Sequence, residues 1–395
     1  MSADLAPAIA ERPDVTGRAL QALRGDSLYF NVAGSGPTFP VAQRAAERFR
    51  TWLSGVGMFS HVGYEAYEAA LAETRRDVAA ALGDPGGEAR IALAQSATEG
   101  LNALVGGLRV PAGSLLCATA EEHASALLPV YRRQDLGDRV RVLPYADDAS
   151  FLETLEAALR DGARALVMSL VSCKTGKVLP VARSCELARA AGAVTVVDAA
   201  QALGQVPVDV RALGADAVVT LGHKWVHGPL ATGAFWVADP ERFAAVRLGW
   251  RSRSAHDLTG GLTLNPDATR FETGTVDAAA FVGLRQALAV QRTLGGRVAE
   301  RVRSLRAHLF ARLRDLPFES LSRPEDPTGI VTVVPRGGGA AGIVARMWAD
   351  ERVVLKHVAE TGMPEAIRIS FWALHRDDDI DRLAAALSRT IAVHA

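Results

Sequence analysis

The stretch Val194-Thr195-Val196-Val197-Asp198, followed by Leu221-Gly222-His223-Lys224-Trp225, decides the fold of this 395-residue chain. The first stretch is an apolar run that ends in an acid. The second directly follows another apolar run, Ala217-Val218-Val219-Thr220. Runs of this kind are typical of strands buried on both faces of a parallel sheet. Because ligands on such sheets bind outside the carboxyl ends of the strands, we expect Asp198 and Lys224 at one site.

Lysine is scarce: the 44 basic residues include only four lysines, Lys174, Lys177, Lys224 and Lys356. Arginine stays protonated, whereas a lysine amine can lose its proton and attack a carbonyl. A strand-end lysine near a strand-end acid suits an aldehyde cofactor with a pyridine ring, since the lysine binds the aldehyde and the acid keeps the ring nitrogen protonated. The chain is biased toward Ala, Arg and Gly, so placement rather than scarcity selects Lys224. The other three lysines are expected outside the Asp198 site.

The composition is typical of a soluble globular enzyme, with 49% hydrophobic and 22% charged residues. The 44 acids balance the 44 bases, so nothing in the charge favours nucleic acid or a membrane surface as a partner. The N-terminal sequence lacks the apolar stretch of a secretion signal, and no apolar run reaches the roughly 18 residues of a membrane span. The three cysteines show neither disulfide nor metal-site spacing. A cytoplasmic enzyme without a bound metal is expected.

From about residue 41, helical and strand-like segments alternate, which predicts an α/β fold with a mostly parallel sheet covered by helices. After Gly260 a long helical region, 277–316, leads into a smaller α+β unit. We therefore expect a large domain over residues 41–275 and a small domain made of residues 1–40 and 276–395. The predicted strands of the large sheet are Arg90–Leu93, Ser114–Thr119, Val140–Leu143, Ala165–Leu170, Val194–Asp198, Ala217–Leu221 and Gly233–Val237, and the small unit is predicted to contain strands Ile330–Val334, Val353–Lys356 and Ile367–Phe371 with helices Ala341–Asp350 and Asp377–Ile391.

The segments Val197-Asp198-Ala199-Ala200-Gln201 and Gly222-His223-Lys224 resemble the class V aminotransferase family. This family includes cysteine desulfurases, isopenicillin N epimerase-like enzymes and C–S lyases. The resemblance extends over roughly residues 28 to 390, with six motifs in the family's order. It implies the type I fold of pyridoxal phosphate-dependent enzymes, with a mostly parallel seven-stranded sheet and a smaller C-terminal α+β domain. It also implies pyridoxal 5'-phosphate as cofactor and a homodimer.

The resemblance assigns roles to residues of these motifs. Lys224 would bind the cofactor covalently, Asp198 would contact the ring nitrogen, and Gln201 would contact the ring hydroxyl. His123, in Glu121-Glu122-His123-Ala124-Ser125, would stack on the ring and move protons at the α-carbon. His223 would reach the phosphate. Lys224, His123 and Asp198 are therefore the expected catalytic residues.

Three further segments match the family. Ala94-Gln95-Ser96-Ala97-Thr98-Glu99-Gly100 is similar to its phosphate-binding turn, in which Ala97 and Thr98 would hold the phosphate and Thr98 would cap a helix. Taken alone, Ser96-Ala97-Thr98-Glu99 would equally make a structural cap. In Phe271-Glu272-Thr273-Gly274-Thr275, Thr275 would complete the phosphate site of the neighbouring subunit. In Ile367-Arg368-Ile369-Ser370, Arg368 would clamp the substrate carboxylate.

Departures from the family pattern narrow the chemistry. Cysteine desulfurases require a nucleophilic cysteine shortly before the Arg368 segment, but residues 354–362 contain none and no cysteine follows Cys185. Cys173 replaces the asparagine that the family places near the ring hydroxyl, which favours the epimerase-like and C–S lyase branches. Position along the chain suggests Tyr64, His227 and Arg251 as further substrate-binding residues.

The expected function is C–S β-lysis of an amino acid or thioether conjugate. Epimerisation, transamination and decarboxylating deamination remain alternatives on the same fold. A different class is also formally possible, because Gly337, Gly339 and Gly342 satisfy the dinucleotide motif G-x-G-x-x-G between a strand and a helix. Against a nicotinamide or flavin oxidoreductase, the strand near 353–356 does not end in the ribose-binding acid, and the small unit offers too few strands.

Overall fold

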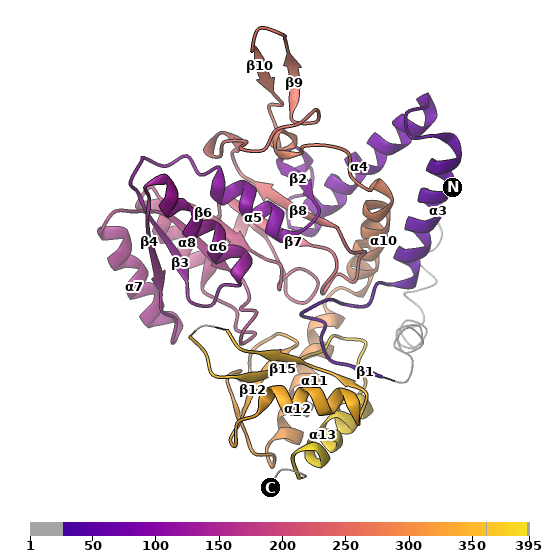
Figure 1. Ribbon diagram of the computed structural model, residues 1–395, viewed down its shortest axis with the longest axis vertical. Helices are drawn as coiled ribbons and strands as arrows, with labels where there is room; N and C mark the ends of the chain where they lie inside the picture. The colour runs from indigo at the N-terminus through magenta and orange to yellow at the C-terminus, as the bar shows by residue number, and fades with distance from the viewer. Residues whose placement is uncertain (1–26, 361, 393–395) are drawn as a thin grey trace.

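The computed structural model describes residues 27–360 and 362–392, and Figure 1 shows an upper and a lower part, each built on a sheet. The upper sheet has seven strands in the order β2-β8-β7-β6-β5-β3-β4. Neighbouring strands are parallel except at β8, which is antiparallel to both β2 and β7. The expected seven-stranded, mostly parallel sheet is confirmed. Its strands are β2 (Ile91–Ala94), β3 (Leu115–Thr119), β4 (Arg139–Leu143), β5 (Ala163–Ser169), β6 (Val194–Asp198), β7 (Ala217–Leu221) and β8 (Gly233–Val237).

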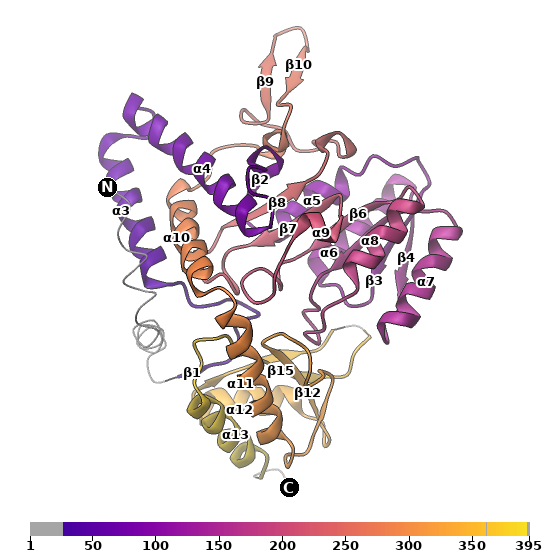
Figure 2. The ribbon, with the colours of Figure 1, turned by 180° about the vertical axis from the view of Figure 1, so that it is seen from behind.

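Helices cover both faces of this sheet, as the two views in Figures 1 and 2 show. The near-continuous apolar strands follow from this arrangement, because side chains that alternate along a strand are buried on both sides. In β6, Val196 packs in one hydrophobic cluster with Leu101, and Val197 packs in the other with Val218. The helices of this part are α3 (Pro40–Val56), α4 (His61–Ala81), α5 (Ala97–Gly106), α6 (Ala124–Arg132), α7 (Asp148–Arg160), α8 (Val181–Ala190), α9 (Val210–Leu213) and α10 (Ala278–Leu294).

The lower sheet is antiparallel and has the order β11-β12-β15-β14. The helical region expected over 277–316 is divided at Gly295, whose φ of 50° ends α10 before α11 begins. The strand expected over 353–356 is also divided: β13 (Val353–Val354) pairs in parallel with β1 (Leu28–Tyr29), whereas β14 pairs with β15. The remaining elements are β11 (Phe318–Ser320), β12 (Ile330–Pro335), β14 (Lys356–Val358), β15 (Ala366–Ser370), α11 (Arg297–Leu313), α12 (Ala340–Ala349) and α13 (Asp377–Ala392).

The division into domains at residues 40 and 275 remains a prediction, and residues 1–26 of the expected small domain lie outside the described residues. A hairpin that the sequence analysis did not anticipate, β9 (Arg253–His256) with β10 (Leu262–Leu264), projects from the upper part (Figure 1). Among the described helices, none combines the length and the apolar character needed to cross a bilayer.

The dinucleotide-binding alternative is wrong. Gly337, Gly339 and Gly342 do lie between β12 and α12, but every strand pairing in this sheet is antiparallel. The motif requires a parallel βαβ unit, in which the helix N-terminus points at a pyrophosphate beside the strand ends. The glycine loop is a connection between a strand and a helix of the lower part.

Candidate active site

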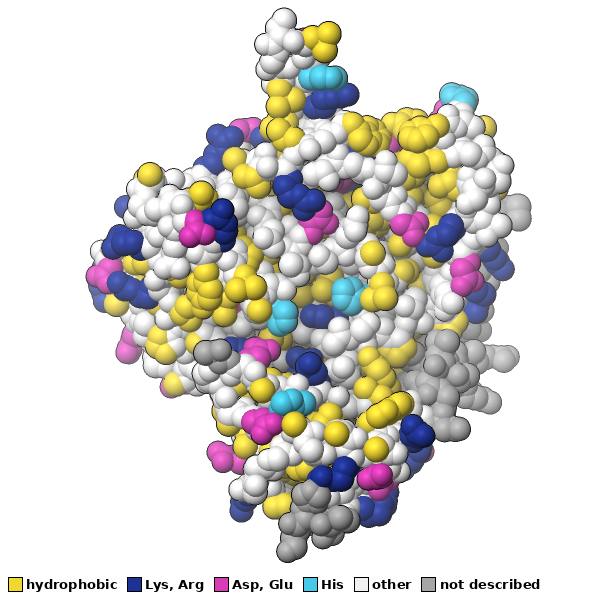
Figure 3. All heavy atoms as spheres, viewed as in Figure 1, with side chains coloured by type: hydrophobic (Ala, Val, Ile, Leu, Met, Phe, Trp, Pro, Cys, Tyr) yellow, Lys and Arg dark blue, Asp and Glu magenta, His cyan; other side chains and the backbone are white. Residues whose placement is uncertain are grey.

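A cavity of about 320 Å³ lies between the carboxyl ends of the central upper strands and the lower sheet. In Figure 3, histidine and basic side chains gather in the hollow between the two parts. Nine of the residues singled out in the sequence line this cavity, and four do not. The nine are Ala97, Thr98, His123, Cys173, Asp198, Gln201, His223, Lys224 and Arg368.

Asp198 and Lys224 reach the cavity from adjacent strands. Asp198 ends β6, where it lies in register with Ser169 of β5, and its Oδ1 accepts the N–H of Ala200 at 2.8 Å. Burial raises the pKa of Asp198, although that hydrogen bond and the charge of Lys224 oppose the shift. Lys224 follows β7, and burial lowers the pKa of its amine despite the attraction of Asp198. The lysine therefore deprotonates more readily than a lysine in water, as an amine that attacks an aldehyde must.

The turn that carries Lys224 leaves no room at Gly36. A Cβ there would lie 2.2 Å from the carbonyl oxygen of Lys224, while the Gly36 N–H donates to the carbonyl of His223 at 2.8 Å. The segment before α3 thus packs directly on the lysine turn, and only glycine fits.

His123 is fixed by a short network of hydrogen bonds. It is the N-cap of α6, and its Nδ1 accepts the backbone N–H of Ser125 at 3.1 Å. The hydroxyl of Thr98 donates to the hydroxyl of Ser125 at 2.9 Å, and that hydroxyl lies 3.0 Å from the same Nδ1. Burial lowers the pKa of His123, and the charge of Lys224 acts in the same direction. The neutral ring therefore carries its proton on Nε2.

Helix α5 presents its N-terminus to the cavity. The expectation that Thr98 caps this helix is wrong, because the N-cap is Ser96. The extended backbone of Ser96 lets its Oγ accept the N–H of Glu99 at 3.1 Å, and Glu99 in turn accepts the N–H of Gln95 at 2.7 Å. Thr98 lies within the first turn, so its hydroxyl faces the cavity. The first-turn amides of a helix have no partners within the helix and form an anion site together with the helix dipole.

Gln201 is held at both ends of its amide. Its Nε2 donates to the carbonyl of Ala33 at 3.0 Å, and its Oε1 accepts the indole N–H of Trp225 at 2.7 Å. Trp225 is fully buried and belongs to the core. Cys173 lines the cavity as a thiol, because burial raises its pKa to about 12.

Arg368 enters the cavity from β15 and is buried without an ion-pair partner among the described residues. Its Nη1 donates to the carbonyl of Cys173 at 2.9 Å, whereas its Nε makes no hydrogen bond in the described chain. Burial lowers the pKa of Arg368. Lys356, directly opposite on β14, also lines the cavity, so the expectation that the other lysines lie outside the site is wrong for this one. The neighbouring strand brings it there, which spacing along the chain does not reveal.

His227 lies behind the site rather than in it. Its backbone has a φ of 58°, its Nδ1 lies 2.9 Å from the carbonyl of Pro37, and its ring is 4.5 Å from that of Trp372. These contacts hold the strained turn that follows Lys224.

Arg251 and Tyr64 are likewise absent from the lining of the cavity. The guanidinium of Arg251 forms ion pairs with Glu68 and Glu272, which occupy its donors. Tyr64 lies on α4 with a ring 38% exposed, stacked against Phe59. Within one chain, neither reaches a ligand in the cavity.

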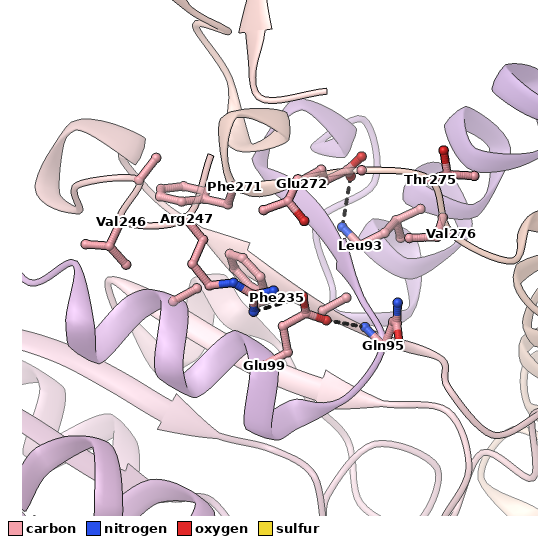
Figure 4. Close-up of a pocket in the computed structure, with 15 residues that line it drawn as sticks. Leu93, Gln95, Glu99, Phe235, Val246, Arg247, Phe271, Glu272, Thr275 and Val276 are labelled. Carbon is pink, nitrogen blue, oxygen red and sulfur yellow. Dashed lines mark hydrogen bonds and ion pairs between the residues drawn. The ribbon is translucent and has the colours of Figure 1, made fainter. Parts of the chain in front are cut away.

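Thr275 lines a separate hollow of about 70 Å³ with Leu93, Glu272 and Val276 (Figure 4). In the same hollow Glu99 meets Arg247 at 3.4 Å. Thr275 is exposed and does not line the cavity that contains Lys224. A role for Thr275 in a phosphate site thus requires a second copy of the chain.

The sequence analysis missed several residues of the cavity. Ser96, Ser125 and Ser169 contribute hydroxyls to it, and Gly34 and Lys356 form part of its wall. For Ser96 the alternative of a structural cap formed by Ser96-Ala97-Thr98-Glu99 is confirmed, because Ser96 is the N-cap of α5 and accepts the N–H of Glu99. Ser169, Gly34 and Lys356 carry no local signal and are brought in by tertiary structure.

The residues present fit the cofactor that the family resemblance implies. The amides of α5, Thr98 and His223 suit its phosphate, Asp198 suits its ring nitrogen, and Lys224 suits its aldehyde. His223 Nδ1 and Arg368 Nε are buried without a hydrogen-bond partner in the described chain. Buried polar atoms are almost always paired, so these two indicate a ligand that carries acceptors.

Comparison with known proteins identifies the family and the fold of the chain. A probable cysteine desulfurase of Methanothermobacter thermautotrophicus is 29% identical over 274 residues, which cover 68% of each chain. The isopenicillin N epimerase of Streptomyces clavuligerus is 29% identical over 401 residues, covering 96% of this chain and 98% of the epimerase. The solved structure of the cystine C–S lyase C-DES with its product, cysteine persulfide, superposes with a TM-score of 0.83 at 24% identity, covering 93% of this chain and 99% of that one. This likeness shows the shared fold. The family model described as aminotransferase class-V matches residues 28–383, and the chain belongs to that family of pyridoxal phosphate enzymes.

Proposed function

We propose that this protein is a C–S β-lyase that acts on an α-amino acid or thioether conjugate. The observation that carries the proposal is the state of its cysteines. Cys117, Cys173 and Cys185 are all buried, and burial raises the pKa of each thiol to about 11 or 12. The segment 354–362, which contributes Lys356 to the cavity, contains no cysteine. A thiol of this kind is a poor nucleophile, so sulfur has to leave by elimination rather than by transfer to the enzyme.

Pyridoxal phosphate, when bound, supplies an electron-withdrawing ring that stabilises negative charge at the α-carbon of an attached amino acid. Lys224 is the proposed covalent attachment point and, as a neutral amine, the base that removes the α-proton. Asp198 holds a proton on the ring nitrogen, since a buried carboxylate is stabilised by a cationic partner. The network of Thr98 and Ser125 holds the imidazole of His123 with its proton on Nε2, where it can stack on the ring and donate.

Arg368 supports an amino acid as substrate. A buried guanidinium without a carboxylate partner is costly unless a ligand supplies one, and the planar fork binds a carboxylate with two hydrogen bonds. In the reaction the Cα–H and Cβ–S bonds break, and the sulfur leaves as a thiol with the proton. The remaining unsaturated amino acid takes up water to give pyruvate and ammonia.

We further propose that the working unit is a homodimer. Thr275 is exposed at the surface, away from the cavity of its own chain. Large apolar side chains are exposed on and near α3 and α4, among them Trp52 at 40%, Phe59 at 77% and Val62 at 57%, and the hairpin tip exposes Leu258. Hydrophobic side chains gather along this upper edge in Figure 3. Exposed apolar side chains in such number favour protein association.

Epimerisation is the second candidate. It requires two groups that exchange the α-proton from different directions, and the cavity contains two such groups, Lys224 and His123. Burial lowers the pKa of both groups, so each gives up its proton more readily than the same side chain in water. The match to the isopenicillin N epimerase over nearly the whole chain supports this candidate as well.

The test is a substrate screen with product identification on the cofactor-loaded protein. Cystine, S-alkylcysteines and single-enantiomer amino acids are incubated with the enzyme, and thiol, pyruvate, ammonia and enantiomer ratio are measured. Equal amounts of thiol and pyruvate are expected from the thioethers. Racemisation without pyruvate would establish the epimerase instead, and a persulfide on an enzyme cysteine during turnover would contradict the lyase proposal.

A further inference from the structure

Two cations stand side by side on the lower wall of the cavity. In the antiparallel pair β14–β15, Lys356 is directly opposite Arg368, and both side chains line the cavity. Directly opposite residues of an antiparallel pair project from the same face, with Cβ atoms roughly 4.5–5.5 Å apart. Like charges in this position are destabilising. The fold therefore tolerates an arrangement that costs stability.

Among the described residues, no acid forms an ion pair with Arg368 or Lys356. The two acids between them in sequence have other partners: Glu360 lies 3.8 Å from Lys174, and Glu365 lies 2.7 Å from His357. Glu360 still attracts Arg368 through space, since its charge opposes the lowering of the pKa of that arginine. Asp198 is the one acid among the described residues that line the cavity, and it lies on the upper sheet beside Lys224.

The groups that suit a phosphate also belong to the upper sheet: the N-terminus of α5, Thr98 and His223. Arg368 and Lys356 belong to the lower sheet. An α-carboxylate supplies one negative charge to Arg368, which leaves the charge of Lys356 without a partner. A ligand that neutralises both cations therefore carries a second anion.

We propose that Lys356 selects substrates whose side chain ends in a second anionic group, such as a carboxylate. This inference rests on the proposed function, in which an amino acid binds by its α-carboxylate to Arg368. The exposed, flexible stem of Lys356 places its ammonium at the mouth of the cavity, where the distal end of a substrate side chain would lie. The substrate class is thus an acidic amino acid or an acidic thioether conjugate.

The experiment uses a matched pair of thioethers, S-carboxymethylcysteine and its amide, S-carbamoylmethylcysteine. The two have nearly the same shape and differ in one negative charge. Their affinities for the cofactor-loaded enzyme are measured from the change in its visible spectrum, and kcat/KM is measured in parallel. Wild-type protein is compared with Lys356→Met, Lys356→Glu and a control, Lys177→Met, whose ammonium lies 5.6 Å from the ring of Tyr145 outside the cavity.

The wild type and Lys177→Met are expected to prefer the acid by about tenfold. In Lys356→Met the preference should fall to about one through weaker binding of the acid, and in Lys356→Glu it should reverse. Added salt should reduce the wild-type preference, because it screens a partly exposed charge pair. An unchanged preference in Lys356→Met would overturn the inference. Equal losses for both thioethers would do the same, because they would mean that Lys356 acts on the cofactor or on the fold.

Failure of the proposed function has a different signature. If neither thioether changes the visible spectrum of any variant, amino acids do not bind at the cofactor, and both the function and the inference are wrong. If the amide changes the visible spectrum of every variant, amino acids do bind at the cofactor, as the proposed function requires. The ratio of the affinities for the acid and the amide then tests the role of Lys356 by itself.

Discussion

The upper and lower walls of the cavity differ in how their polar groups are paired. On the upper wall, Asp198, His123 and Thr98 each have a hydrogen-bond partner within the protein, whereas Nδ1 of His223 has none in the described chain. On the lower wall, Arg368 and Lys356 face the cavity as cations without an ion-pair partner in the described chain. The upper wall is organised before any ligand arrives, as an electrostatic site for a fixed cofactor should be. The lower wall depends on charge that the ligand brings, and is therefore where substrates are distinguished.

The largest effect is expected on the upper wall, from Lys224→Ala. This variant should lose the borohydride-reducible bond to the cofactor and at least about 10³-fold in turnover, because base and attachment point disappear together. Peptide mapping after reduction of the wild type should place the cofactor on Lys224. Since Lys356 also lines the cavity, cofactor found on Lys356 would contradict the assignment of the two walls.

Asp198→Ala tests the electron sink on the same wall. Cofactor should still bind in part, but turnover should fall on the order of 10² to 10³-fold, because an unprotonated ring nitrogen stabilises a carbanion poorly. Single-turnover kinetics separate this loss from loss of cofactor. A near wild-type rate would mean that another group protonates the ring.

Arg368→Gln tests the role of the lower wall in binding the substrate carboxylate. KM for amino acid substrates should rise about 100-fold with a smaller change in kcat, because a buried charged pair is lost while the upper wall is intact. The matched control is Arg314→Gln, which removes an exposed arginine at the end of α11. Equal losses in KM and kcat would show that Arg368 also positions the cofactor.

Glu122→Gln tests the contribution of a buried carboxyl group behind the upper wall to the stability of the protein. Glu122 is fully buried and accepts hydrogen bonds from Thr119 and Ser169, and burial raises its pKa from 4.5 to about 7. Because the pKa is raised in the folded state, folding favours the protonated form of Glu122. The contribution of Glu122 to the free energy of unfolding is therefore complete below pH 4.5. It falls by up to about 3 kcal/mol as the pH rises through 7. Urea unfolding at several pH values should show the wild type losing stability relative to Glu122→Gln across this window. A constant difference would mean that the pKa of Glu122 is not raised.

The smallest effect is expected when Cys117, Cys173 and Cys185 are all replaced by serine. Because no cysteine accepts sulfur in the proposed reaction, most of the activity should remain. Any loss should be reproduced by Cys173→Ser alone and appear as weaker cofactor binding, measured by cofactor titration. If the triple variant were inactive and a persulfide formed on a cysteine of the wild-type enzyme, the lyase proposal would be wrong and the enzyme would catalyse the desulfurase reaction.

Six of the seven upper strands were predictable because they are short apolar runs buried on both faces, and the family motifs lie at the ends of several of them. The edge strand β4 is largely exposed and was predictable from its alternation of arginine and valine. Other features were harder to predict. The break at Gly295 between α10 and α11 interrupts a helical pattern without changing its polarity. The β9–β10 hairpin of the upper part is exposed and lacks a strong alternation. Lys356 reaches the cavity only because β14 pairs with β15. Arg251 and His227 lie close in sequence to the site, but buried ion pairs and stacking hold them elsewhere.

The pairing of β1 with β13 has a consequence for the order in which the chain folds. Leu28 is among the first described residues, and its partner Val353 lies more than 300 residues further along. On a ribosome, the upper sheet emerges long before β13 exists, so β1 has to wait on the order of tens of seconds for its partner. Contacts of such long range are slow to form because loop closure precedes any gain from pairing. Arg368 and Lys356 are therefore expected to assemble last, so a truncated chain could retain the cofactor half of the cavity without the half that selects the substrate.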